Sequence, residues 1–264
     1  MNSQPANATH HSRHRELAVS TSLAPIIHCR RLAMPIVGGD WETAGRALAD
    51  DTPIPLQQAW LARPDPQFQP ATVRTGWWDE TLWVLAELRD VDIFNPVTEF
   101  NAEFFRYGDV FEMFLRPVTQ DAYYEFHVGP QNQTFQLRVP SAAAFRQPPS
   151  QRNWKLTAPV MQSWARVDVP QHRWQVMASV PFAGICESPA AMACREWLFS
   201  FSRYDYTQGN VRPCLSSTSP HAQVNFHRQE EWGRLRFEAD DVASGVRSWE
   251  ETQRRTQSGE KRRG

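Results

Sequence analysis

The chain has 264 residues, 41% hydrophobic and 22% charged, and its 28 Lys and Arg nearly balance 29 Asp and Glu, giving a formal net charge of -1. This balance excludes a polybasic nucleic-acid-binding protein, and the composition is that of a globular chain rather than a disordered one. The 11 Trp, 15 Phe and 20 Pro, against only 12 Gly, favour strands and loops over helices.

The two ends of the chain differ from its middle. Residues 1–33 are polar, show no periodicity and contain no apolar core of a secretory signal, so they are predicted to be disordered. Residues 241–264 are predicted to form a short helix and a disordered tail, which leaves 34–240 as the folded domain. No apolar run approaches the roughly 18 residues of a membrane helix, so no membrane span is expected.

Between these ends, apolar and polar residues alternate with a period of two, which is typical of half-buried strands. In chain order, strands and hairpins are predicted at residues 71–90, 108–117, 123–130, 134–139, 163–182, 196–205 and 233–239. The first hairpin turns at Asp79, Glu80 and Thr81, and helix is expected only around residues 183–194. The pattern predicts an all-β antiparallel sandwich, immunoglobulin-like or jelly-roll in type, of about nine or ten strands.

Three consecutive strands are each predicted to have one apolar and one polar face. Glu112 falls on one face of the first strand, and Glu125 and His127 share a face of the second. In the third strand Arg138 falls on the polar face, opposite an apolar face made of Phe135, Leu137 and Val139. Such a sheet can bury one side and offer the other as a shallow polar surface for a ligand.

The residues do not predict catalysis. Asp109 and Glu112 are the most suggestive carboxylate pair, but residues three apart on a strand point to opposite faces. Motifs for a serine nucleophile, a zinc protease, a P-loop and a dinucleotide site are absent. His127 beside Glu125 is interpreted as a hydrogen-bonding residue rather than a metal ligand. We therefore predict no catalytic residue, no metal-ligating residue and no enzyme activity.

The four cysteines, Cys29, Cys186, Cys194 and Cys214, form no C-x-x-C pair. Cys186 and Cys194 flank a loop that a disulfide could close, but reduced thiols are the favoured interpretation.

Seven segments occur in an order that resembles the carbohydrate-binding module family 9-like (CBM9-like) domain over about residues 34–240. They are GGDWETA, WWDETLWVLAELRDVDI, GDVFEMFLRP, YYEFHVGP, RWQVMASVPF, WLFSFSRYD and SPHAQVNFHRQEEWGRLRF. The resemblance implies a β-sandwich with a non-catalytic role in binding saccharides in carbohydrate catabolism, beside or attached to a glycoside hydrolase. It also suggests a secreted or periplasmic location, although the sequence shows no signal peptide.

The resemblance implies a sugar held between two aromatic rings above polar side chains of the concave sheet. Phe226 matches the second ring position, whereas Arg106, flanked by Tyr107, stands at the first. Glu112 matches the family's strand carboxylate and His127 stands where the family has an arginine. The predicted ligand-binding residues are Glu112, Phe226, Tyr107, His127, Arg106, Glu125, Arg138, Arg203 and Asn225.

Two alternative functions remain open from the sequence. One is a glycoside hydrolase or its accessory domain, and another is a haem-bearing electron-transfer sandwich, for which Met113 and His127 are the available ligands. No cofactor is expected, with structural calcium left open; the acidic pairs Asp90/Asp92 and Asp240/Asp241 are interpreted as solvated loop acids.

Overall fold

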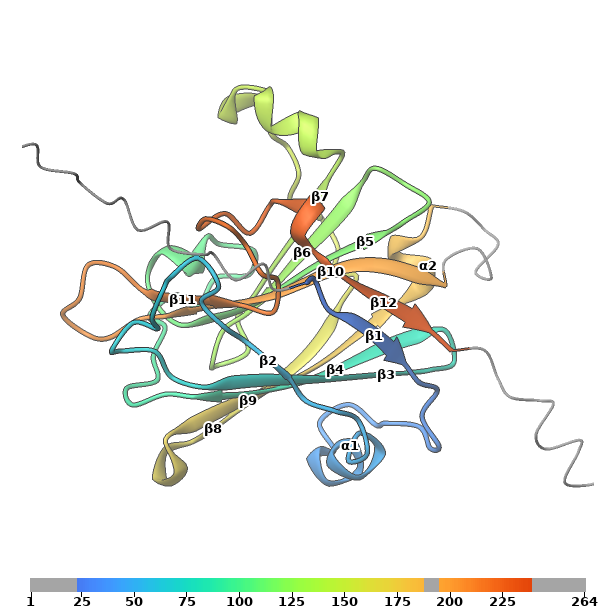
Figure 1. Cartoon of the computed structure of the whole chain (residues 1–264), viewed down its shortest axis with the longest axis horizontal. Helices are drawn as coiled ribbons and strands as arrows, with labels where there is room; N and C mark the ends of the chain where they lie inside the picture. Colours follow the sequence, from blue (N-terminus) through green and yellow to red (C-terminus); the bar gives the residue numbers. More distant parts are fainter. Residues whose placement is uncertain (1–22, 188–194, 239–264) are drawn as a thin grey trace, which may run out of the picture.

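The computed structural model describes residues 23–187 and 195–238, which form two β-sheets packed face to face (Figure 1). The seven-stranded sheet runs in the order β1, β12, β10, β5, β6 and β7, with β11 paired to β10. Its strands are β1 (Ile26–Cys29), β5 (Val110–Pro117), β6 (Tyr123–Val128), β7 (Thr134–Val139), β10 (Glu196–Asp205), β11 (Cys214–Ser217) and β12 (Gly233–Phe237).

The five-stranded sheet runs in the order β2, β3, β4, β9 and β8. Its strands are β2 (Ile54–Pro55), β3 (Ala71–Trp78), β4 (Thr81–Arg89), β8 (Gln162–Asp168) and β9 (Arg173–Pro181). Asp79 and Glu80 join β3 to β4 in a two-residue turn with positive φ angles of 48° and 54°. This left-handed geometry matches the twist of the paired strands, so the tight hairpin expected at this position is present.

The main core lies between the inner faces of the two sheets. Trp174 of β9, Trp197 of β10 and Phe111 of β5 are fully buried there. Because side chains alternate along a strand, the residues between these core positions point out of the sandwich on both sheets. The predicted all-β sandwich is confirmed.

The outer face of the five-stranded sheet is covered by α1 (Trp41–Ala47), the blue helix below the sheets in Figure 1. Asp40 caps this helix by accepting a hydrogen bond from the Thr43 backbone amide at 3.0 Å. The helix packs through Ala44 and Ala47 against sheet residues that include Trp83. The remaining short helices are α2 (Phe182–Ile185), η1 (Phe104–Arg106), η2 (Ala142–Arg146), η3 (Pro149–Gln151), η4 (Val169–Gln171) and η6 (Gln229–Glu231).

Two sequence predictions about extent are wrong. The boundary at residue 33 cuts off β1, which pairs parallel with β12 and buries Cys29 completely. Four residues are too few to show a strand period, so this strand could not be predicted from the sequence. The described residues also contain twelve strands rather than nine or ten, because β1, β2 and β11 are short. The predicted C-terminal helix and tail at 241–264 lie outside the described residues.

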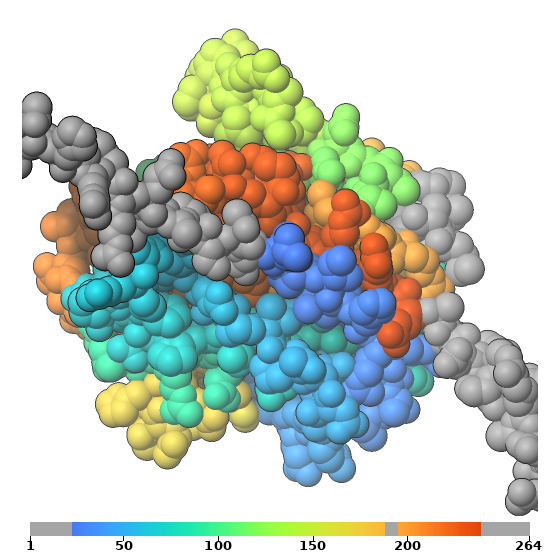
Figure 2. Space-filling view, in the orientation of Figure 1, coloured from blue at the N-terminus to red at the C-terminus, as the bar shows by residue number. Residues whose placement is uncertain are grey.

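The outer face of the seven-stranded sheet lies beneath two long connections. The segment from 140 to 161 carries η2 and η3 and rises above this sheet, drawn yellow-green in Figures 1 and 2. The segment from 218 to 232, between β11 and β12, lies beside it and is coloured orange-red. No helix of the described residues is both long and apolar enough to cross a membrane.

Candidate functional site

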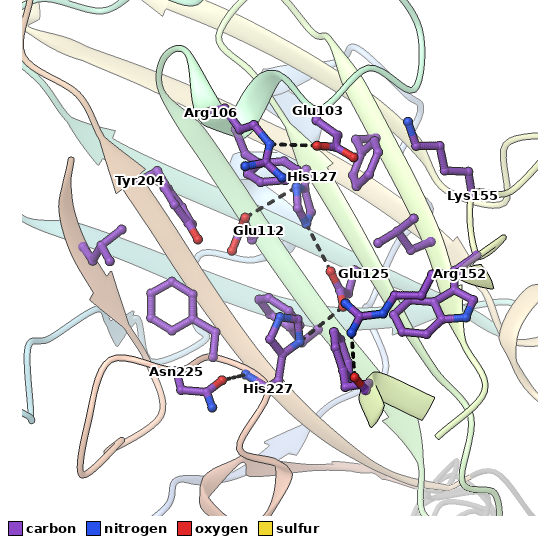
Figure 3. Close-up of a pocket in the computed structure, with 18 of the residues that line it drawn as sticks. Glu103, Arg106, Glu112, Glu125, His127, Arg152, Lys155, Tyr204, Asn225 and His227 are labelled. Carbon is purple, nitrogen blue, oxygen red and sulfur yellow. Dashed lines mark hydrogen bonds and ion pairs between the residues drawn. The ribbon is translucent and has the colours of Figure 1, made fainter. Parts of the chain in front are cut away.

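A cavity of about 580 Å³ opens on the outer face of the seven-stranded sheet. Its floor is formed by β5, β6, β7 and β10, and its walls by residues 103–106, 145–155 and 224–227 (Figure 3). The polar residues that line it are Glu103, Arg106, Glu112, Glu125, His127, Arg152, Lys155, Tyr204, Asn225 and His227. Its size suits a small organic ligand.

Strand register places the charged residues of the floor side by side. Glu112 of β5 is the direct cross-strand partner of His127 of β6, and Glu125 lies two residues before His127 on the same face. The imidazole lies between the two carboxylates, with Nδ1 3.4 Å from Glu112 Oε1 and Nε2 3.6 Å from Glu125 Oε2. His227 extends this row, since its Nδ1 lies 3.3 Å from Glu125 Oε1 and 3.0 Å from the Tyr123 hydroxyl.

The floor groups have different protonation preferences. Burial, reinforced by the nearby Glu125, raises the pKa of Glu112 to about 7 despite the opposing charge of His127. Burial also favours a neutral Glu125, but contacts with His127 and His227 hold the pKa of Glu125 below its usual value. For His127, burial disfavours the cation, yet Glu112 and Glu125 raise its pKa. The contacts therefore favour the ionised form of Glu125 and the protonated form of His127.

Several buried polar atoms of the floor lack hydrogen-bond partners among the described residues. They are Glu125 Oε1 and both ring nitrogens of His127, although each residue is at most 4% exposed. The ion-pair distances of 3.3 to 3.6 Å around them are longer than a good hydrogen bond. Buried polar atoms are nearly always hydrogen-bonded in folded proteins. The hydrogen-bonding capacity of these atoms is therefore not fully used by the described residues.

Aromatic rings surround the polar floor. Phe145 and Trp154 meet edge to face at 4.9 Å on one wall, and both are half-buried. Phe226 lies on the wall of residues 224–227, with its ring centroid 6.0 Å from that of Tyr204. Burial and, above all, the charge of Glu112 raise the pKa of Tyr204, so its hydroxyl stays protonated and can donate. The cavity thus combines flat apolar surfaces with directed hydrogen-bonding groups.

Six of the nine predicted site residues line this cavity. They are Arg106, Glu112, Glu125, His127, Asn225 and Phe226. Phe226 is only 6% exposed and belongs to an apolar cluster with Phe114 and Trp232, so it presents part of its ring rather than an exposed face. Arg106 forms an ion pair with Glu103, in which Arg106 Nε lies 2.7 Å from Glu103 Oε2.

The other three predicted residues lie elsewhere. Tyr107 is 58% exposed and faces a neighbouring depression beside Tyr206. Arg138 pairs with the exposed Glu187 on the opposite face of β7. The predicted faces of β7 are reversed, because Leu137 pairs across the strands with Glu125 and lines the cavity.

Arg203 faces the core side of β10 and is fully buried. Its Nη2 lies 2.9 Å from Asp90 and 3.1 Å from Asp205. Asp90 is 1% exposed, so its interpretation as a solvated loop acid is wrong. Burial raises the pKa of Asp109, which completes the cluster, to about 8, and that of Asp205 to about 7. These three carboxylates could hold a cation, but Arg203 already supplies a positive charge among them.

The haem alternative also meets a geometric obstacle. Met113 is fully buried in the core between the sheets, whereas His127 lies on the cavity face. These two side chains cannot ligate one haem iron from opposite sides of a sheet.

Several lining residues were not predicted from the sequence. Phe145, Arg152, Trp154 and Lys155 all come from the segment between β7 and β8, and His227 follows Phe226. The available signal was the length of that segment, because long connections in compact domains are often functional. Cys194 lies outside the described residues, and Cys29 and Cys214 are buried thiols.

Comparison with solved structures shows which known folds this chain resembles. The chain is similar to a candidate carbohydrate-binding protein from Bacteroides uniformis ATCC 8492, with a TM-score of 0.64 and 14% identity over 82% of this chain and 100% of that one. It is similar to a CBM9 module from Caldicellulosiruptor kristjanssonii in complex with cellotriose, with a TM-score of 0.56 and 13% identity over 82% of this chain and 96% of that one.

A CBM9 module from the same organism, in complex with glucose, gives a TM-score of 0.54 and 13% identity over 82% of this chain and 98% of that one. No protein-family model and no curated protein matches the sequence. The domain therefore has a CBM9-like fold, as the resemblance of the sequence segments implied.

Proposed function

We propose that this protein binds a saccharide in the cavity on the outer face of its seven-stranded sheet, without catalysing a reaction on it. The observation that carries the proposal is the floor, where buried polar atoms of Glu125 and His127 lack hydrogen-bond partners in the described residues. Sugar hydroxyl groups both donate and accept hydrogen bonds, so they can pair with carboxylate oxygens and imidazole nitrogens. The CBM9 structures of similar fold contain cellotriose and glucose, which supports the same ligand class.

The walls of the cavity add the second element of saccharide recognition. The apolar face of a sugar ring, made of C–H groups, packs against the flat surface of an aromatic side chain. Trp154 and Phe145 on one wall and Phe226 on the other lie where they could contact a ring bound to the floor. The cavity is open and its rings are few, so we expect modest affinity. A role in carbohydrate catabolism beside a glycoside hydrolase forms part of the proposal.

The test is a glycan screen with the full chain, followed by calorimetry on each saccharide that binds. Glu125→Gln is the informative variant, because it keeps the size of the side chain but removes the charge and one acceptor. We expect it to weaken binding by about 1.5–3 kcal/mol, the range for a hydrogen bond to a charged group. Glu187→Gln, an exposed acid outside the cavity, is the matched control. Binding that is unaffected by Glu125→Gln would place the ligand elsewhere.

A glycoside hydrolase is the second candidate, because one observation favours it. Glu112 and Glu125 are buried close together with pKa values displaced in opposite directions, as in enzymes that pair an acid with an ionised carboxylate. Against it, both carboxylates are directed at the imidazole of His127. Chromatography of saccharides incubated with the protein separates the candidates, since any release of shorter products would overturn the non-catalytic proposal.

A further inference from the structure

The wall of the cavity formed by residues 145–155 carries two cations that no carboxylate neutralises. Within the described residues, Arg152 and Lys155 have no ion-pair partner. Both donate to backbone carbonyl groups: Arg152 Nη2 to Phe145 at 2.6 Å and Nε to Gln147 at 3.0 Å, and Lys155 Nζ to Asn101 at 3.2 Å. By contrast, Arg106 on the neighbouring wall is paired with Glu103.

The guanidinium group of Arg152 is held in place, with its Nη1 amino group left unused. The two carbonyl groups fix one side of it, and the rings of Phe145 and Trp154 lie 5.3 and 5.4 Å from its central carbon. Its Nη1 group donates to no acceptor of the described residues. Figure 3 shows Arg152 extending over the floor of the cavity, while Lys155 lies farther along the same wall. A fixed cationic donor of this kind is suited to an anionic group on a ligand.

The carboxylates of the cavity lining already have neighbours of their own. Glu125 Oε2 lies 3.6 Å from His127 Nε2, and Glu103 is paired with Arg106. Glu112 is buried with a pKa of about 7, so it carries only part of a charge near neutral pH. The cations of the lining that pair with no carboxylate of the described residues therefore lie on the wall of Arg152 and Lys155. This positive charge is local, because the whole chain has a net charge of -1.

We propose that the cavity prefers a saccharide bearing a carboxylate, that is, a hexuronic acid residue. Its acid group binds Arg152 Nη1 in the field of Lys155, and its ring hydroxyls bind the floor. The inference rests on the proposed function and names the ligand class of the same site. The carboxylates of the floor disfavour a polyanion such as nucleic acid, since extended negative charge would have to lie against Glu125.

The test compares sugars that differ only in the acid group. Calorimetry of the full chain at pH 7 is carried out with glucuronate against glucose, and with galacturonate against galactose. We expect at least one acid to bind about tenfold more tightly than its neutral partner, which corresponds to about 1.4 kcal/mol. Raising the salt concentration to 0.5 M should reduce this ratio, because the attraction acts in a cavity open to solvent.

Arg152→Gln should bring the ratio close to one, whereas Arg212→Gln, which removes the same charge from an exposed position outside the cavity, should leave it unchanged. Equal or tighter binding of the neutral sugars, or a preference that survives Arg152→Gln, overturns this inference but leaves the proposed function standing. If none of the four sugars binds and the glycan screen is negative, both proposals fail.

Discussion

Replacing Glu112 by Gln should alter how the stability of the protein depends on pH. Glu112 is 2% exposed, and burial raises its pKa from 4.5 to about 7. A carboxyl group with a raised pKa in the folded state stabilises the fold below its unfolded pKa, and this contribution is lost as the pH rises through the folded pKa. The rise corresponds to about 3 kcal/mol in the free energy of unfolding, lost between about pH 4.5 and 7.

The neighbouring imidazole acts in the same direction. The carboxylate of Glu112 raises the pKa of His127 against the effect of burial, so its protonated form also stabilises the fold more at low pH. Because the two groups interact directly, they titrate as a pair. Glu112→Gln removes the first contribution and reduces the second, so the stability of the variant should vary less between pH 5 and 8.

Urea unfolding followed by tryptophan fluorescence measures this at pH 5, 6, 7 and 8. From pH 5 to pH 8, we expect the free energy of unfolding of the variant to rise by about 3 kcal/mol relative to that of the wild type. Glu103→Gln, an exposed acid on the rim, should follow the wild type within about 0.5 kcal/mol at every pH. A constant difference between wild type and Glu112→Gln would refute the reasoning, because Glu112 would then titrate alike in the folded and unfolded chains.

Three further predictions concern stability and binding. Arg203→Met should destabilise the fold by about 3–5 kcal/mol in urea unfolding, because it leaves buried carboxylates without a counterion. The control Arg138→Met removes an exposed ion pair and should cost less than about 1 kcal/mol. Similar losses for the two variants would be inconsistent with a buried ion pair at Arg203. Phe226→Ala should cost about 3–5 kcal/mol, since the ring is packed within an apolar cluster, and a loss below 1 kcal/mol would show that it is not. Trp154→Ala should weaken saccharide binding about tenfold and Tyr107→Ala should leave it unchanged, and calorimetry showing the reverse would move the site to the neighbouring depression.

The sequence predicted the strands well because a half-buried sheet imposes a period of two that short windows reveal. It placed Glu112, Glu125 and His127 on one face for the same reason, and the register of β5 and β6 puts them there. What a single strand cannot show is which of its faces adjoins which face of its neighbour. That relation depends on cross-strand pairing, and for β7 the two faces were predicted on the wrong sides of the sheet.

Gln136 shows how the faces of β7 were reversed. Its side chain is 1% exposed on the core side, and its amide oxygen accepts hydrogen bonds from the backbone of Val160 and Met161 at 2.9 and 3.0 Å. A polar residue can occupy a buried face when its amide group finds such partners. Phe135 and Leu137 meanwhile form part of the cavity, so polarity alone assigned the wrong side.

The walls of the cavity could not be predicted because they come from irregular connections. Arg152 follows a short 3₁₀ turn and is placed by hydrogen bonds to local carbonyl groups, which leave no period in the sequence. The carbonyl of Trp154 accepts a hydrogen bond from the backbone amide of Arg138 in β7, a contact that the sequence does not reveal. Arg203 was predicted to bind ligand because it is a basic residue on a strand of the sheet that carries the predicted site. Its ion pairs with Asp90 and Asp205 show that the charge is used within the fold.

The central claim is that the floor of the cavity on the seven-stranded sheet binds a saccharide. A crystal structure of the full chain with the tightest-binding saccharide from the glycan screen tests it most directly. We predict a sugar ring between the walls of residues 145–155 and 224–227, with hydroxyl groups within hydrogen-bond distance of Glu125 and His127. A sugar bound anywhere else on the protein, with these buried atoms still without hydrogen-bond partners, would contradict the claim.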